Sequence, residues 1–307
     1  MAAVVDRRPS ADLISGAMAT DFTEETAADA VIESFGPDTN PRLREVLTSL
    51  VKHLHAFASD VELTIPEWEK AIDFLTRVGQ KCDDERQEFI LLSDVLGLSM
   101  LVETISNRKF GVATESTVLG PFHVVESPVR ELGDNIDQVG TGTPCVVTGR
   151  VVSVDGAPLP GATLDVWQAN DQGFYDVQQP DVQPRTNGRG LFTANEEGEF
   201  WFRTIVPSYY PIPTDGPVGE LLIATGRHAF RPAHIHFIVE APGHRPLTTH
   251  IFVAGSEYIE SDTVFAVKKS LVVDFEEVTD EAQAARWNVG KVPFRHADFE
   301  IIMQPGS

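Results

Sequence analysis

Cysteine is nearly absent from this chain of 307 residues, which contains only Cys82 and Cys145. Two thiols can build neither a disulfide framework nor a thiolate metal site, and their scarcity is typical of a reducing compartment. Residues 1–8 lack the basic start and apolar block of a secretory signal, and no apolar run reaches membrane-spanning length. We therefore expect a cytoplasmic protein that does not insert into a membrane.

Basic residues are also few. Lys and Arg number 24 against 46 Asp and Glu, which gives a net charge of −22 at pH 7. Nucleic-acid phosphates and anionic membrane surfaces repel so acidic a chain, and no Lys- or Arg-rich run offsets this locally. The charge argues against nucleic acid as a partner, while a hydrophobic fraction of 42% is ordinary for a globular protein.

Up to about residue 110, apolar residues recur at helical spacing. In residues 43–57 they form a stripe at i, i+3, i+4 and i+7, with Asn40 as the expected cap and Pro41 as the first helical residue. Three more helices are predicted, over about residues 23–34, 64–78 and 85–105. The last is apolar nearly all round, so we expect it to be buried against other helices or another subunit.

After about residue 115 the helical period gives way to short runs rich in Val, Ile, Thr and Phe, separated by Gly, Pro and Asp turns. We predict an α+β fold, with a helical domain in residues 1–114 followed by an antiparallel β-sandwich domain in residues 115–307. The predicted strands cover residues 145–154, 162–167, 199–205, 234–239, 247–253, 271–275 and 299–303.

Two histidines, His234 and His236, lie two residues apart in one of these predicted strands. Their side chains leave the same face, roughly 6.6 Å apart along the strand, so that both can reach one metal ion. Such a pair also fits two ordinary histidines on a partly solvated strand face. Further ligands are needed to decide between the two interpretations.

Tyrosine is scarce, and three of the four tyrosines lie in predicted loops that suit a functional site. Tyr175 follows a strand, while Tyr209 and Tyr210 open a loop stiffened by three prolines. Any single tyrosine also fits a hydrophobic anchor. Two phenolates would lower the charge of a ferric ion to +1, a hydroxide would bring it to zero, and two imidazoles would complete a five-coordinate centre.

Three segments resemble the intradiol ring-cleaving dioxygenases. They are Arg231-Pro-Ala-His234-Ile-His236-Phe237, Tyr210-Pro-Ile-Pro-Thr-Asp-Gly-Pro-Val-Gly219, and Leu164-Asp-Val-Trp-Gln-Ala-Asn170 with the residues up to Tyr175. The helical part is similar to that family too, so the resemblance covers almost the whole chain. It implies an enzyme with non-haem Fe(III) bound by Tyr175, Tyr210, His234 and His236.

The resemblance also implies a mechanism. Substrate oxygens displace a hydroxide and Tyr210, which takes up a substrate proton, and the activated ring then reacts with O2. Arg231 is expected to stabilise the negative charge that develops, and His250 to hydrogen-bond near the same place. The alternative for Arg231 is an ion pair at the surface.

Within the family, residues 87–97 and 115–124 look most like the hydroxyquinol 1,2-dioxygenases, and His250 stands where catechol-type members usually have glutamine. The expected product is 3-hydroxy-cis,cis-muconate or its keto form, maleylacetate. Asp94 is expected to accept a hydrogen bond from the third hydroxyl of hydroxyquinol. The residues expected to line the pocket are Leu91, Asp94, Val118, Leu119, Gly120, Ile212, Pro213 and Val264.

The helical part has an implied role as well. The family resemblance implies a homodimer formed through the N-terminal helices, with a phospholipid held between them, while the β-sandwich carries the catalytic Fe(III) site.

Three other functions remain open at this stage. The chain can be a catechol or chlorocatechol 1,2-dioxygenase. The spacing His234-x-His236-x-x-x-Glu240 also fits a cupin-type enzyme with a divalent metal. A transthyretin-like binding protein without metal would use residues 149–161 as part of its sandwich.

Overall fold

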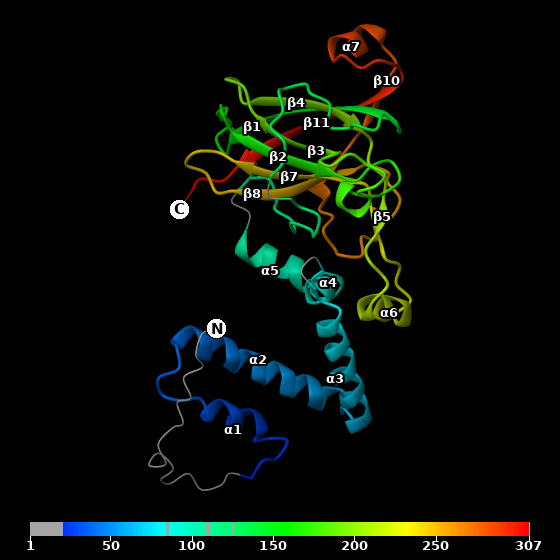
Figure 1. Cartoon of the computed structure of the whole chain (residues 1–307). Helices are drawn as coiled ribbons and strands as arrows, with labels where there is room; N and C mark the ends of the chain where they lie inside the picture. The colour runs from blue at the N-terminus through cyan, green and yellow to red at the C-terminus, as the bar shows by residue number, and fades with distance from the viewer. Residues whose placement is uncertain (1–20, 84–85, 109–110, 125, 307) are drawn as a thin grey trace, which may run out of the picture. The chain divides into compact units, whose positions relative to one another are not determined.

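The computed structural model describes residues 21–83, 86–108, 111–124 and 126–306 (Figure 1). By its contacts the chain divides into two units, Met1–Leu75 and Thr76–Ser307. The predicted domains, 1–114 and 115–307, follow the change from helices to strands, and that division stays a prediction. Each unit is described by itself.

The first unit is built from helices. α1 (Ala27–Glu33) packs against α2 (Pro41–Asp60), and α3 (Ile65–Gln80) begins in this unit. As predicted, Pro41 opens α2 and the side chain of Asn40 caps it, accepting hydrogen bonds from the backbone N–H groups of Arg42 and Leu43 at 3.0 and 3.1 Å. α2 buries none of its residues, and its apolar stripe is about half exposed.

The single helix predicted over residues 85–105 is wrong, because the structure has two helices there and residues 84–85 lie outside the described part. α4 (Glu88–Val95) and α5 (Leu98–Ser106) meet at a bend of 81°. Gly97 causes the break, since its φ of +73° is a left-handed conformation that cannot continue an α-helix. One side of the pair is buried, but its other apolar residues, among them Phe89, Leu98 and Ile105, are about half exposed.

Among the described helices none alone is long and apolar enough to cross a membrane. The bent pair of α4 and α5 meets the criteria of length and composition only when its two helices are taken together.

Two sheets enclose the main core (Figure 1). One has the order β10-β11-β1-β4 and the other β3-β2-β7-β8-β9. Their strands are β1 (Pro144–Ser153), β2 (Thr163–Gln168), β3 (Arg189–Thr193), β4 (Glu199–Ile205), β7 (His234–Glu240), β8 (Leu247–Val253), β9 (Val272–Val273), β10 (Glu276–Val278) and β11 (Phe294–Met303).

The sandwich confirms the predicted α+β fold. Side chains that alternate along the strands meet between the sheets, including Val147, Val151, Leu164, Phe237 and Ile251. The sheets are not purely antiparallel as predicted, because β1 pairs with β11 and β8 with β9 in parallel. Parallel neighbours arise where strands far apart in the sequence pair, which local patterns do not reveal.

A smaller ribbon and short helices complete the second unit. β5 (Tyr210–Pro211) pairs with β6 (Phe230–Arg231), and α6 (Pro217–Ala224) lies between them in sequence. The remaining elements are η2 (Asp176–Gln178), η3 (Lys269–Leu271) and α7 (Glu281–Arg286). The β5–β6 register places Tyr210 opposite Arg231.

Candidate metal centre

The outer face of the second sheet carries two of the four predicted ligands. His234 and His236 alternate with the core residues Ile235 and Phe237 on β7, so both imidazoles leave the face away from the core. Across neighbouring strands, His236 stands opposite Trp167 of β2 and His250 of β8. The two-residue period of β7 therefore places both histidines on the same face of the sheet.

Tyr175 comes from the segment between β2 and β3, immediately before η2. Its Oη lies 3.0 Å from Nε2 of His236 and 3.5 Å from Nε2 of His234, and the two Nε2 atoms are 3.1 Å apart. All three side chains are buried. The structure thus brings together three of the four predicted donors around one point.

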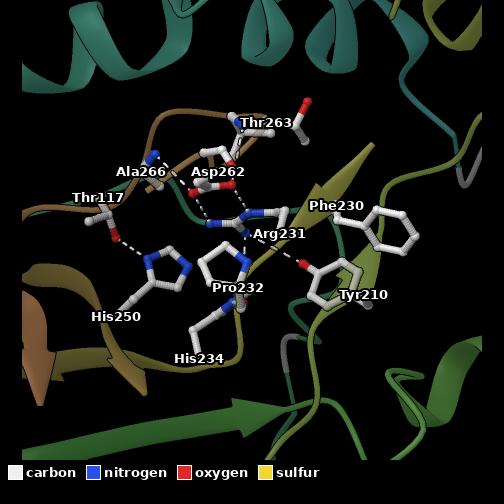
Figure 2. A network of polar contacts seen from close by, with 12 residues as sticks. Thr117, Tyr210, Phe230, Arg231, Pro232, His234, His250, Asp262, Thr263 and Ala266 are labelled. Atoms are coloured by element: carbon white, nitrogen blue, oxygen red, sulfur yellow. Dashed lines mark hydrogen bonds and ion pairs between the residues drawn. The ribbon is translucent and has the colours of Figure 1, made fainter. Parts of the chain in front are cut away.

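Tyr210 joins this point through the β5–β6 ribbon. Its ring lies 5.4 Å from that of Tyr175 and 5.5 Å from that of His234, measured between centroids. Nη1 of Arg231 is 3.4 Å from both Tyr210 Oη and His234 Nε2 (Figure 2). Arg231 is buried, so the alternative of an ion pair at the surface is wrong.

The three donors around this point suit a bound cation. Nδ1 of His234 lies 2.7 Å from the carbonyl oxygen of Pro232, so Nδ1 carries the proton and Nε2 presents its lone pair. Burial lowers the pKa of His234 and of His236 well below the usual value, which keeps both neutral. Nε2 of His236 and Oη of Tyr175 converge on the lone pair of His234 Nε2, an arrangement in which one cation satisfies all three donors.

Charge at the centre is set by its surroundings. Burial and the neighbouring Tyr210 raise the pKa of Tyr175, so without a cation its phenol stays protonated. Burial acts to lower the pKa of Arg231, but the charge and hydrogen bonds of Asp262 outweigh it and raise that pKa, so the guanidinium stays charged. The site therefore combines a buried positive charge with a Tyr175 phenol that a bound metal ion would ionise.

His250 is a third histidine in the same cluster. One donor nitrogen from each of His234, His236 and His250 lies within 4.8 Å of the others, a grouping that can hold a metal ion. Nδ1 of His250 hydrogen-bonds with Oγ1 of Thr117, and its Nε2 has no hydrogen-bond partner (Figure 2). The structure therefore places His250 beside the two predicted histidine ligands and leaves one of its nitrogens available, while its contact with a substrate stays a prediction.

The predicted pocket residues are spread over four segments. Leu91 and Asp94 lie on α4, where Leu91 is buried and Asp94 half-buried. Burial raises the pKa of Asp94, while a hydrogen bond with Ser99 and the positive charge of Arg231 act against this rise.

The segment before the first sheet contributes Gly120, which lies against the centre. A Cβ there would come 3.0 Å from Cε1 of His236, at a φ of +78° that favours glycine. Ile212 and Val264 are buried, Val118 and Pro213 are half-buried, and Leu119 is 43% exposed. Their contact with a substrate stays a prediction.

Several residues at the site were missed. Phe122 stacks on Tyr175 and Trp167 on His236, with ring centroids 4.6 and 4.5 Å apart. Asp262 pairs with Arg231, and Thr117 with His250. Trp167, Phe122 and Thr117 lie in segments that the family resemblance had singled out, whereas Asp262 lies outside all of them.

The cupin-type arrangement does not form. Glu240 lies four residues beyond His236 on β7 and is exposed at the strand end. Four residues of strand span about 13 Å, too far for both side chains to bind one ion.

Comparisons with known proteins identify relatives of this chain. Residues 40–114 match the family model described as catechol dioxygenase N terminus, and residues 119–305 match the model described as dioxygenase. The chain is 50% identical to a hydroxyquinol 1,2-dioxygenase of Rhizobium sp. (strain MTP-10005), with 92% of this chain and 96% of that protein covered.

Two further relatives are similar. A 6-chlorohydroxyquinol 1,2-dioxygenase of Cupriavidus pinatubonensis is 50% identical, over 93% of this chain and 99% of its own length. The crystal structure of hydroxyquinol 1,2-dioxygenase from Pseudomonas putida DLL-E4 has a TM-score of 0.85 and 48% identity, with 92% of this chain and 99% of that chain covered. With both family models matched and this likeness along nearly all of its length, the chain belongs to the intradiol ring-cleavage dioxygenases.

Proposed function

We propose that the chain cleaves hydroxyquinol (1,2,4-trihydroxybenzene) with O2 between its two adjacent hydroxylated carbons. The product is 3-hydroxy-cis,cis-muconate, whose keto form is maleylacetate. The relatives named above act on hydroxyquinol or its 6-chloro derivative and are 48–50% identical to this chain. The observation that carries the choice of substrate is this likeness, and Asp94, a half-buried carboxylate on α4 beside the buried Leu91, supports it.

We propose Fe(III) as the metal, bound by Tyr175, Tyr210, His234 and His236. Phenolate oxygens favour a hard trivalent ion, and the buried neutral imidazoles complete the set without adding charge. When bound, ferric iron would draw electron density from the deprotonated diol and make its ring carbon reactive toward O2. A divalent ion held by His234, His236 and His250 is the competing arrangement.

The protein's own residues supply the proton transfer and the charge. Tyr210 Oη, as a phenolate, takes up a proton from a substrate hydroxyl. Arg231 Nη1, 3.4 Å from Tyr210 Oη, stabilises negative charge on the oxygens that gather there. Asp94 accepts a hydrogen bond from the third hydroxyl, and the apolar side chains of Leu91, Ile212 and Val264 keep water from the ring.

Oxygen uptake tests this function, with hydroxyquinol, 6-chlorohydroxyquinol, catechol, pyrogallol and chlorocatechols compared side by side. We expect hydroxyquinol to have the highest kcat/KM. Asp94→Asn should lower kcat/KM for hydroxyquinol by about 10- to 100-fold, the value of a hydrogen bond to a charged group. Catechol, which lacks the third hydroxyl, is the matched control and should be much less affected. Faster cleavage of catechol by the unmodified protein would contradict the choice of substrate.

We further propose a homodimer through the N-terminal helices, with a phospholipid bound between them. The apolar stripe of α2 supports it, because Leu43, Val46, Leu50, Leu54 and Phe57 are each 44–55% exposed in the single chain. Water-exposed apolar stripes of this size mark surfaces that another molecule covers. A cytoplasmic location stays a prediction.

A further inference from the structure

Asp262 is a buried carboxylate in the segment between β8 and η3, and its side chain is 1% exposed. A carboxylate removed from water is costly unless it is paired and hydrogen-bonded. Both requirements are met here, because each of its oxygens accepts one hydrogen bond from Arg231 and one from the backbone (Figure 2).

The contact with Arg231 has two points. Nε of Arg231 donates to Oδ1 of Asp262 at 3.1 Å, and Nη2 donates to Oδ2 at 3.3 Å. A planar carboxylate that binds two nitrogens of a guanidinium fixes the orientation of the whole planar group. The third nitrogen, Nη1, is therefore directed away from Asp262, toward Tyr210 Oη and His234 Nε2 at 3.4 Å each (Figure 2).

The contact with the backbone fixes a second part of the site. Oδ1 of Asp262 accepts from the N–H of Val264 at 3.3 Å, and Oδ2 accepts from that of Ala266 at 3.1 Å. The same segment is tied to the end of α4, because Arg227 donates to the carbonyl oxygens of Val95 and Thr263 at 2.6 and 2.8 Å. Val264, a predicted pocket residue, is thus held relative to both Arg231 and the helix that carries Asp94.

We propose that Asp262 is a positioning residue, which aims Nη1 of Arg231 at the metal centre and fixes the pocket wall at Val264. This proposal rests on the proposed function, because Asp262 acts through Arg231, the residue that stabilises negative charge in the proposed reaction. The competing interpretation is that Asp262 only neutralises a buried arginine. In that case it would affect stability and not the direction of Nη1.

A double-mutant cycle separates the two interpretations. Asp262→Asn keeps the size of the side chain but replaces one acceptor oxygen with a donor, so the two-point contact is lost. We expect kcat with hydroxyquinol to fall by about 10- to 100-fold, as for loss of a group that orients another, while KM changes by less than about threefold. In an Arg231→Gln background the same change should cost less than about threefold, because its effect passes through Arg231. An equal loss of kcat in both backgrounds would overturn the proposal.

The iron-loaded protein provides a readout without turnover. We expect Asp262→Asn to retain the metal and its visible absorbance band, with the maximum shifted because the charge beside Tyr210 Oη has moved. Arg231→Gln should also shift the band, and adding Asp262→Asn to it should change nothing further. This cycle stays informative if hydroxyquinol is not consumed, so a failure of the proposed function and a failure of this proposal can be told apart.

Controls account for folding. Glu277→Gln removes a half-exposed ion pair with Arg295 on the other sheet and should leave kcat and the band unchanged. If Asp262→Asn does not fold, Arg231→Lys carries the test, because lysine keeps the charge but not the planar two-point contact. We expect a loss in kcat of about tenfold or more, and a wild-type kcat in Arg231→Lys would overturn the proposal.

Discussion

At the scale of single residues, Tyr175 has the contacts expected of a metal ligand. Its Oη lies within 3.5 Å of both histidine Nε2 atoms, and its ring stacks on Phe122. Tyr175→Phe would keep the stacking and remove the oxygen. We expect the iron-loaded variant to lose or shift the red-brown colour of phenolate-to-iron charge transfer, and its kcat to fall by about 100-fold or more.

Tyr209 offers the matched control for that substitution. It precedes Tyr210 but turns to the rings of Phe230 and Tyr258, with centroids 5.7 and 5.2 Å away. Tyr209→Phe should therefore retain both colour and activity. A visible spectrum that changes with Tyr209→Phe and not with Tyr175→Phe would show that the ligand assignment is wrong.

The residue scale also shows what local patterns reveal. His234, His236, Tyr175 and Arg231 lie in segments with a distinctive spacing or composition, and the structure brings them together. Asp262 lies in a segment without such a signal, and it reaches the site only through Arg231, a partner 31 positions away in the chain. A side chain whose role comes from a distant partner cannot be recognised from its own neighbours.

At the scale of elements, the loop that follows Tyr210 is held by ion pairs to the segment between α3 and α4. Asp215 accepts from Lys81 at 2.9 Å and from Arg86, and Arg86 also pairs with the buried Glu88 at 2.7 Å. Glu88 in turn accepts from the backbone N–H of Val218 in the first turn of α6. This network connects the ribbon of Tyr210 with the helix that carries Asp94.

Asp215→Asn tests how much this network stabilises the fold. Hydrogen bonds from Arg86 and Lys81 lower the pKa of Asp215 to about 2, below the unfolded value of about 3.9. A lowered folded pKa means stabilisation that is complete above about pH 5 and is lost as the pH falls from about 4 to 2. Because the carboxylate is 66% exposed, we expect less than about 1 kcal/mol.

Thermal unfolding from pH 7 down to pH 3 measures this effect. The melting temperature of Asp215→Asn should be lower by about 2 °C or less at pH 7, and the difference should shrink below about pH 4. It should also shrink in 0.5 M salt, because exposed charges are screened. A difference that does not depend on pH would show that the ionised carboxylate is not its cause.

At the scale of the whole molecule, the apolar stripe of α2 in the first unit is about half exposed to solvent, as expected of a surface that a second chain covers. We expect light scattering to report twice the mass of one chain, and organic extraction with mass spectrometry to recover a phospholipid. The double substitution Leu50→Lys with Leu54→Lys should yield monomer, because it places two charges on the exposed stripe of α2.

Ser49→Lys is the control, since Ser49 is exposed on α2 outside the apolar stripe. It should leave the mass unchanged. A single-chain mass for the unmodified protein would disprove the homodimer, whereas a dimer that survives the double substitution would mean that another surface forms it.

By itself, the sequence determined the features that depend on short stretches of chain. The cap at Asn40, the alternating strands β1, β4, β7 and β8, and the shared face of His234 and His236 all follow from spacing of two or 3.6 residues. The tertiary structure decided the parallel pairing of β1 with β11, the 81° bend at Gly97, and the aim of Arg231. The strand pairing and the aim of Arg231 depend on contacts between residues distant in sequence, and the bend depends on the φ angle that Gly97 adopts in the folded chain. Local sequence patterns report neither of these.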